Sequence, residues 1–379
     1  MPPGSSQAAD VAVIGAGVIG SACAWRLAVA GQRVALIDER PGAGASAAAA
    51  GMLAPVTEAH FGEERLLALN LESARRYPAF AAELAEVTGL DPGYRETGTL
   101  VVARDRDDRA VLDELAAYHA RLGSTVERLS AAEARALEPG LARAVRGALY
   151  APGDHQVDNR ALLAALRAAC TAAGVEPVRL RAERLCVAGE RVTGVVLRDG
   201  RVLGAGVVVL AAGAWSGALG GLPPSALALR PVKGQLLHLR ATGPPALCER
   251  VVRGLRVYIV PRGDGRYVVG ATVEERGFDT SVTAGGVFDL LRHAYELLPG
   301  VTELELTETV AGLRPATPDN APLIGPGPLE NLVVATGHYR NGVLLAPITA
   351  AAVTELVTSG VLPEEVRPFA PDRPTRLVP

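Results

Sequence analysis

The chain has 379 residues, a length that is too great for one compact core and favours two domains or one domain interrupted by another. Hydrophobic residues make up 49% of it and charged residues 21%, as in soluble globular proteins and unlike disordered chains. The net charge of −3 excludes a cationic surface that would bind nucleic acid or acidic lipid.

No segment of the sequence predicts a membrane span or a disulfide scaffold. The longest apolar run, 207–212, is too short to cross a bilayer, and residues 1–10 lack the basic and apolar regions of a secretory signal. The cysteines stand apart, without a Cys-x-x-Cys pair, which excludes a zinc finger and an iron–sulfur cluster: Cys23, Cys170, Cys186 and Cys248. We expect a cytoplasmic protein without a resident metal and without membrane or nucleic-acid partners; a homo-oligomer is compatible with the sequence.

The first forty residues predict a βαβ unit. An apolar strand, 10–14, leads into a glycine turn, 15–20, and then into a helix, 21–30. A second strand, 33–37, follows after Gly31, which ends the helix.

The next part of the chain mixes helices with a meander of strands. In chain order we expect a helix over 63–88 that Pro78 kinks or breaks, then a strand over 95–104. Two helices follow, over 108–122 and over 158–174, and Asp158 caps the second of them. The meander strands are expected over 185–187, over 192–198 and from 202 onward. The meander turns at Asp199-Gly200, a strong hairpin signal. Residues 206–212 form a continuous apolar run, typical of a buried parallel strand.

The last third begins with an antiparallel pattern. From 233 to 272, polar and apolar residues alternate in several strands with no helix between them. After them we expect a helix over 286–298, a buried strand over 331–336, a glycine turn over 337–342, a helix from near Val343 to 357, and an extended tail over 367–379.

The order of these segments predicts an α/β fold with a discontinuous Rossmann-like domain. Nucleotide-type segments lie at the start, near the middle and at the end of the chain, and the antiparallel segments fall between them. We assign residues 1–90, 150–229 and 306–379 to the Rossmann-like domain. Residues 91–149 and 230–305 then form an inserted α+β substrate domain built on an antiparallel sheet.

The glycine turn predicts a bound dinucleotide. Gly15-x-Gly17-x-x-Gly20 follows a strand and opens a helix, so that backbone can approach a pyrophosphate and the helix N-terminus can hold its charge. Asp38, at the end of the second strand, is placed to accept hydrogens from both ribose hydroxyls. The alternative is an ordinary glycine turn with a surface aspartate. This motif does not separate NAD from FAD.

A second stretch of small residues, Ser46 to Met52, points to a flat ligand. Its side chains are minimised as if backbone must approach a ring, with Ser46 able to donate to phosphate and Gly51 and Met52 against the ring. The alternative is a flexible linker, although residues 52–55 are too apolar for a solvated one.

Together these motifs resemble a known family. In order, they are the opening glycine turn, Ala50-Gly51-Met52-Leu53-Ala54-Pro55, Ala211-Ala212-Gly213-Ala214-Trp215-Ser216-Gly217, Gly312-Leu313-Arg314-Pro315 and Gly337-His338-Tyr339-Arg340-Asn341-Gly342. Over nearly its whole length the chain resembles the FAD-dependent D-amino acid oxidase superfamily. The stretches at 50–55 and 337–347 look most like the glycine oxidase branch, which serves thiamine thiazole synthesis.

The resemblance implies a set of contacts for FAD and for the substrate. The residues that would contact FAD are Gly15, Gly17, Val18, Ile19, Gly20, Asp38, Glu39, Ala45, Ser46, Ala50, Gly51, Met52, His338, Tyr339, Arg340, Asn341, Gly342, Val343 and Leu344. Backbone near Arg184 would contact the adenine, and Tyr258, Arg314 and Arg340 would contact the substrate. Some members attach the flavin through a C-terminal cysteine, but no cysteine follows Cys248, so we expect non-covalent FAD.

The residues themselves can support amine oxidation beside a flavin. Arg314 offers a planar fork that binds a carboxylate bidentately, unless it is held in a structural ion pair. Tyr258 either donates to the same carboxylate or is a core tyrosine with a satisfied hydroxyl. Arg256 shares the strand face of Tyr258, and it is an alternative residue for drawing the substrate into the site. Val273, after the next strand, is placed to line the pocket.

The C-terminal glycine turn and the single lysine complete the candidates. The helix after the turn would point positive charge at the pyrimidine end of the flavin, with Arg340 near the substrate oxygens. His338 is either a proton carrier or a residue that stabilises the turn. Lys233, the only lysine beside 37 arginines, is either an ammonium needed near the flavin or oxygen, or a chance survivor of the compositional bias.

These inferences predict an FAD-dependent oxidase that converts glycine, through iminoglycine, to glyoxylate, ammonia and hydrogen peroxide and so supplies thiamine thiazole synthesis. Its partners would be an amino-acid substrate and oxygen. The alternatives are an oxidase of sarcosine or small D-amino acids, a quinone-linked D-amino acid dehydrogenase, and a non-catalytic nucleotide-binding module in which Arg314 and Tyr258 are structural.

Overall fold

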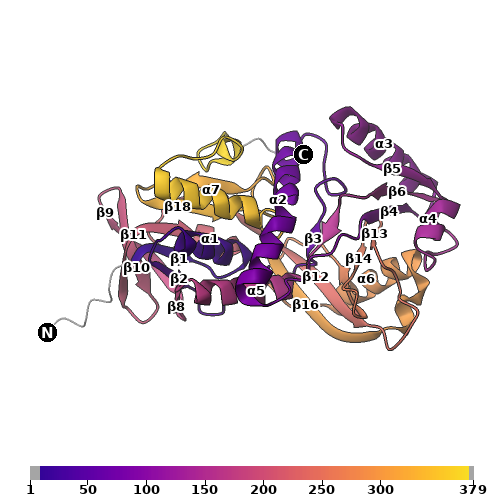
Figure 1. The fold of residues 1–379 in the computed structure, drawn as a ribbon, viewed down its shortest axis with the longest axis horizontal. Coiled ribbons are helices and arrows are strands. Elements are labelled where there is room, and N and C mark those ends of the chain that lie inside the picture. Colours follow the sequence, from indigo (N-terminus) through magenta and orange to yellow (C-terminus); the bar gives the residue numbers. More distant parts are fainter. Residues whose placement is uncertain (1–8, 375–379) are drawn as a thin grey trace.

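The computed structural model describes residues 9–374, which form two eight-stranded sheets with helices packed on them. Figure 1 shows the first sheet on the left and the second on the right. The first has the order β17-β18-β11-β1-β2-β8, with β10 and β9 continuing from β11. Its strands are β1 (Ala9–Ile14), β2 (Val34–Ile37), β8 (Glu176–Val178), β9 (Ala182–Ala188), β10 (Arg191–Leu197), β11 (Val202–Leu210), β17 (Leu323–Pro326) and β18 (Leu332–Thr336).

The centre of the first sheet is parallel and buried on both faces. Strands β8, β2, β1, β11 and β18 pair in parallel, whereas β9, β10 and β17 join by antiparallel pairs. Val11 and Val13 of β1 pack in one hydrophobic core, and Ala12 and Ile14 pack in another on the opposite face. Because both faces are covered, this strand is apolar at every central position.

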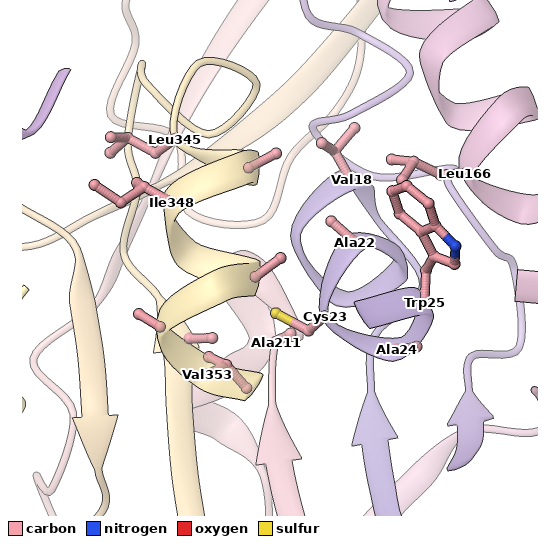
Figure 2. Close-up of a cluster of buried hydrophobic side chains, with 14 of the residues drawn as sticks. Val18, Ala22, Cys23, Ala24, Trp25, Leu166, Ala211, Leu345, Ile348 and Val353 are labelled. Carbon is pink, nitrogen blue, oxygen red and sulfur yellow. The ribbon is translucent and has the colours of Figure 1, made fainter. Parts of the chain in front are cut away.

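Helices cover one face of this sheet. They are α1 (Val18–Val29), α2 (Glu64–Thr88), α5 (Asn159–Ala172) and α7 (Ala346–Ser359). Figure 2 shows Cys23 pointing from α1 toward α7 and Trp25 lying beside Leu166 of α5. The small residues Ala22 and Cys23, both fully buried, allow α1 and α7 to pack closely, and this packing fixes the start of α1 above the sheet.

The second sheet has the order β16-β12-β15-β14-β13-β4-β6-β5, and all of its pairs are antiparallel except β13 with β4. Its strands are β4 (Thr99–Ala103), β5 (Glu127–Ser130), β6 (Gly147–Ala151), β12 (Arg230–Arg240), β13 (Val251–Arg253), β14 (Tyr258–Pro261), β15 (Arg266–Gly270) and β16 (Glu305–Ala316). Its helices are α3 (Arg106–Leu122), α4 (Ala131–Leu137) and α6 (Ala284–Leu297). A small ribbon of β3 (Met52–Leu53) and β7 (His155–Gln156) and the 3-10 turns Gly213–Ala218, Pro299–Glu303 and Arg367–Phe369 complete the fold.

The predicted fold class is confirmed: a mostly parallel α/β sheet assembled from separate parts of the chain, and a largely antiparallel second sheet. The domain bounds stay a prediction. The proposed division at 305/306 falls at the start of β16, which pairs along its length with β12 of the second sheet.

Three local predictions differ from the structure. Pro78 does not break helix α2: this residue is exposed, and the buried Tyr77 and Phe80 hold the helix on either side of it, while a kink there stays a prediction. Helix α7 begins at Ala346 rather than near Val343.

The third error concerns the C-terminal tail, which is not extended over its described residues, 367–374. Phe369 is buried, and the guanidinium of Arg373 donates to both carboxylate oxygens of Asp319 at 2.8 and 2.9 Å. The rest of that predicted tail, 375–379, lies outside the described residues. Between residues 9 and 374, none of the helices combines the length and the apolar character that crossing a bilayer requires.

Candidate functional site

A cavity of about 730 Å³ extends from the glycine turn after β1 to the second sheet. Its walls come from the ends of β1 and β2, the small-residue loop before β3, strands β12, β14 and β16, and the turn before α7. Most of the predicted site residues line it: Gly15, Gly17, Val18, Ile19, Asp38, Glu39, Ala45, Ser46, Ala50, Gly51, Met52, Tyr258, Arg314, His338, Tyr339, Arg340, Gly342 and Val343. Gly20, Asn341 and Leu344 lie behind this lining.

The glycine turn brings the start of α1 to the cavity. Gly15 has a φ of +102°, which a residue with a side chain rarely adopts, and a Cβ at Gly20 would overlap the carbonyl oxygen of Gly15. Helix α1 has no side-chain cap at Gly17, while the N–H of Val18 donates to Ser46 Oγ at 2.9 Å. The helix therefore presents its N-terminal positive end to the cavity.

Asp38 lies beside this helix end. Its Oδ2 accepts the N–H of Ala16 at 2.8 Å, and its Oδ1 accepts the N–H of Arg40 at 2.8 Å. Two backbone donors thus fix the carboxylate at the end of β2. Each carboxylate oxygen keeps further lone-pair capacity, which suits the acceptance of ribose hydroxyl hydrogens.

The small-residue loop forms a wall without bulky side chains. Gly51 has a φ of +71°, and a Cβ there would overlap the carbonyl oxygen of Val157. Gly312 of β16 packs directly on this loop, because a Cβ at residue 312 would lie 2.6 Å from Cβ of Ala48. These close contacts hold the loop in place without bulky side chains, and the contact of residues 46–52 with a flat ring stays a prediction.

Arg314 reaches the opposite part of the cavity from β16. Its Nη1 donates to the carbonyl oxygen of Thr272 at 3.1 Å and lies 3.4 Å from that of Lys233. Within residues 9–374, no carboxylate lies within 4 Å of this guanidinium. The alternative of a structural ion pair therefore has no partner in the described chain, and the fork is available to an anionic ligand.

Tyr258 and Arg340 accompany Arg314 along the cavity wall. Burial raises the pKa of the Tyr258 phenol, and the nearby charge of Arg314 lowers it by a smaller amount, so the phenol stays protonated at neutral pH. Arg340 lies over the ring of Tyr339, 5.1 Å from its centroid, and its Nη2 donates to the Tyr339 hydroxyl at 3.3 Å. Arg256 and Val273 line the same part of the cavity.

His338 has the environment of a residue that stabilises the turn. Its ring is 3% exposed, and Nε2 lies 3.0 Å from Oγ1 of Thr349 in α7. Burial lowers its pKa to about 3, so the ring is neutral at physiological pH. A proton carrier at neutral pH would need a pKa much nearer 7.

The hypothesis that the Lys233 ammonium lies near the flavin or oxygen was wrong. Residues Gly234 and Leu236 of β12 line the cavity, so strand alternation turns Lys233 to the other face. There its Nζ lies 2.7 Å from Oδ2 of Asp279 and 3.8 Å from Oε2 of Glu274. Its side chain is 1% exposed, and its ammonium is held in these ion pairs on the face away from the cavity.

Sequence reasoning missed six charged residues that line the cavity, Arg40, Glu58, Arg181, Glu183, Arg253 and Asp289, of which Glu58 and Arg253 form an ion pair. Glu58 follows β3, and its Oε1 lies 3.5 Å from Nη1 of Arg253 at the end of β13. The same Nη1 donates to the carbonyl oxygen of Thr57 at 2.7 Å. No motif marked either residue, and only their meeting in the fold identifies them as part of the site.

The cavity brings together a helix N-terminus, a carboxylate placed to bind ribose hydroxyls, a wall of small side chains, and a guanidinium that has no acidic partner in the described chain. This donor set fits a flavin dinucleotide. Residues 10–356 match the model of a family described as FAD dependent oxidoreductase. The chain belongs to this family, and the predicted resemblance is confirmed.

More narrowly, the chain is similar to glycine oxidases. It is 38% identical over 364 residues to the glycine oxidase of Geobacillus kaustophilus, which covers 95% of this chain and 96% of that protein. A crystal structure of glycine oxidase from the same species has a TM-score of 0.90 and 37% identity, covering 97% of this chain and 99% of the other. The bifunctional protein ThiO/ThiG of Synechocystis is 36% identical over 370 residues, 96% of this chain and 54% of that protein. The chain is therefore an FAD-dependent, glycine oxidase-like oxidoreductase.

Proposed function

We propose that the protein oxidises glycine to iminoglycine, which water hydrolyses to glyoxylate and ammonia, with oxygen as the electron acceptor and hydrogen peroxide as the other product. The observation that carries this proposal is the Arg314 guanidinium, which faces the cavity beside Tyr258 with no carboxylate of the described chain within 4 Å. A small amino acid supplies the missing carboxylate. The similarity to glycine oxidases supports glycine as that amino acid.

The proposed roles follow from the geometry. Arg314 binds the substrate carboxylate through Nη2, since carbonyl oxygens of Lys233 and Thr272 already accept from Nη1, and so orients the α-carbon toward the wall formed by Gly51 and Met52. The protonated phenol of Tyr258 donates a second hydrogen bond, and Arg340 adds positive charge at the same end of the cavity. FAD, when bound, would supply the two-electron acceptor for the Cα–N oxidation. The residues named in the sequence analysis as FAD contacts would hold it, without a covalent bond.

Absorbance and turnover measurements test this proposal. The purified protein should be yellow, and acid precipitation should release its flavin into the supernatant. Oxygen uptake and peroxide should be highest with glycine in a panel that includes sarcosine, D-alanine and D-proline. Higher turnover with another member of the panel would replace glycine as the substrate. Flavin bleaching without oxygen uptake would favour the quinone-linked dehydrogenase.

We also propose a role in thiamine thiazole synthesis, in the cytoplasm. Its support is the similarity to ThiO/ThiG proteins, in which the matched part makes up about half of the chain. Deletion of the gene in its host should create a requirement that exogenous thiazole or thiamine relieves. Growth of the deletion strain without either supplement would contradict this role.

A further inference from the structure

Arg262 is a buried arginine directly behind the small-residue wall of the cavity. It follows β14, its side chain is 7% exposed, and its guanidinium makes four hydrogen bonds to neutral acceptors. Nη1 donates to Oε1 of Gln156 at 3.2 Å and to the carbonyl oxygen of Val157 at 3.0 Å. Nη2 donates to the carbonyl oxygen of Ala50 at 2.9 Å and to Oδ1 of Asn159 at 3.0 Å.

Asn159 links Arg262 to the other end of the loop 46–50. It is 1% exposed at the start of α5, and its Nδ2 donates to the carbonyl oxygen of Ser46 at 2.7 Å and lies 3.3 Å from that of Ala47. Ser46 in turn accepts the N–H of Val18 at the start of α1. One guanidinium of the second sheet is thereby linked to both ends of the loop 46–50 and, through Ser46, to the helix that faces the cavity.

Within the described residues Arg262 forms no ion pair, although the charges of Asp158 and Asp264 act on it from farther away. In the described part of the chain, no carboxylate oxygen lies within 4 Å of it, although Arg266 of the same hairpin pairs with Asp158 at 3.0 Å and Asp264 at 2.8 Å. Burial lowers the pKa of Arg262 to about 10, which leaves it charged at neutral pH. A buried cation is costly, and here carbonyl and amide oxygens of the wall and its support compensate for it.

We propose that Arg262 and Asn159 are positioning residues that hold the small-residue wall in the shape that binds the flavin. Neither residue lines the cavity, so both act through the backbone of residues 46–50. The inference rests on the proposed placement of FAD in this cavity. It assigns a role to a contact between the two sheets that no motif in the sequence marks.

Titration of apoprotein with FAD tests the role of Arg262. Arg262→Ala should raise the FAD dissociation constant at least tenfold and shift the visible absorption band of the bound flavin, because Ala50 loses its donor and Gln156, Val157 and Asn159 behind the loop lose theirs. Arg266→Ala is the matched control, since Arg266 lies in the same hairpin but contacts no residue of the wall. For this control, the FAD dissociation constant should stay within twofold of the wild-type value, and the absorption band of the bound flavin should not shift.

Asn159→Asp tests the same idea in a variant of unchanged size. Asp can still accept from Arg262 but cannot donate to the carbonyl oxygens of Ser46 and Ala47, so we expect at least fivefold weaker FAD binding. The double variant Arg262→Ala/Asn159→Ala should lose less FAD affinity than the product of the fold-losses of its two single variants, because both residues act on one loop.

The outcomes separate this inference from the proposed function. If the wild-type protein binds no FAD, both are overturned. If it binds FAD but does not oxidise glycine, only the proposed substrate is wrong. If both single variants bind FAD within twofold of the wild type with an unshifted band, while the melting temperature of their apoproteins falls, Arg262 and Asn159 support the fold alone and the inference is overturned.

Discussion

The guanidinium of Arg314 lies against the backbone of Gly234 on the neighbouring strand, so that a Cβ at residue 234 would overlap both of its Nη atoms. We therefore predict that Gly234→Ala displaces the Arg314 fork and raises the KM for glycine on the order of tenfold. Gly153→Ala is the control, because a Cβ there meets no atom within 4 Å. Steady-state oxygen uptake measures both, and equal KM values in the two variants would contradict this contact.

Removal of the fork itself should have a direct effect on substrate binding. We predict that Arg314→Ala raises the KM for glycine at least tenfold, which corresponds to about 1.4 kcal/mol of lost binding. Arg314→Lys keeps the charge without the planar fork and should fall between the wild type and Arg314→Ala. An unchanged KM in Arg314→Ala would mean that this residue is structural.

The pair of Lys233 and Asp279 should respond asymmetrically to substitution. Asp279→Asn leaves a buried ammonium with only Glu274 at 3.8 Å, and we expect a clear loss in the free energy of unfolding. Lys233→Met leaves a half-exposed Asp279 that water can solvate, so the expected loss is smaller. Urea denaturation of both variants measures the difference, and a larger loss in Lys233→Met would refute it.

His338 should make the protein less stable in acid. Its pKa is about 3 in the folded protein and about 6.5 in the unfolded chain, so between these values the unfolded chain binds more protons. Stability is therefore lost as the pH falls through this window, by up to about 1.4 kcal/mol per pH unit.

The variant His338→Gln isolates this effect. The variant lacks the titration, so its unfolding free energy should fall less steeply than that of the wild type between pH 6 and pH 4. Burial raises the pKa of Asp154 to about 6, so its protonation stabilises the fold as the pH falls. This contribution is the same in the wild type and the variant, and it therefore cancels when their unfolding free energies are compared. Parallel pH profiles of the two proteins would show that His338 does not titrate as its burial implies.

Local sequence patterns predicted the parts of the site that are built from neighbouring residues. The glycine turn, the carboxylate of Asp38 and the cap of α5 by Asp158 each depend on a few consecutive residues, and all are found in the fold. The start of α7 was placed three residues too early, because a tertiary contact holds the turn open. There the N–H of Tyr339 donates to the carbonyl oxygen of Pro315 at 3.0 Å, and Tyr339 has a φ of +46°.

Other features depend on distant segments, and the sequence could not reveal them. Glu58 and Arg253 meet only because β13 lies beside β4 and near the loop after β3. The direction of Lys233 depends on which face of β12 forms the cavity, and alternation alone leaves that choice open. Arg262 is one of 37 arginines in the sequence, and only its burial and its four acceptors distinguish it.

The burial of Lys233 has a practical consequence for chemical labelling. It is the only side-chain primary amine in the sequence, and with 1% of its side chain exposed it is shielded from succinimidyl esters and aldehyde crosslinkers while the protein is folded. A lysine introduced on the surface, for example at the exposed Arg292 of α6, would thus become the one accessible side-chain amine for attaching a dye or a solid support.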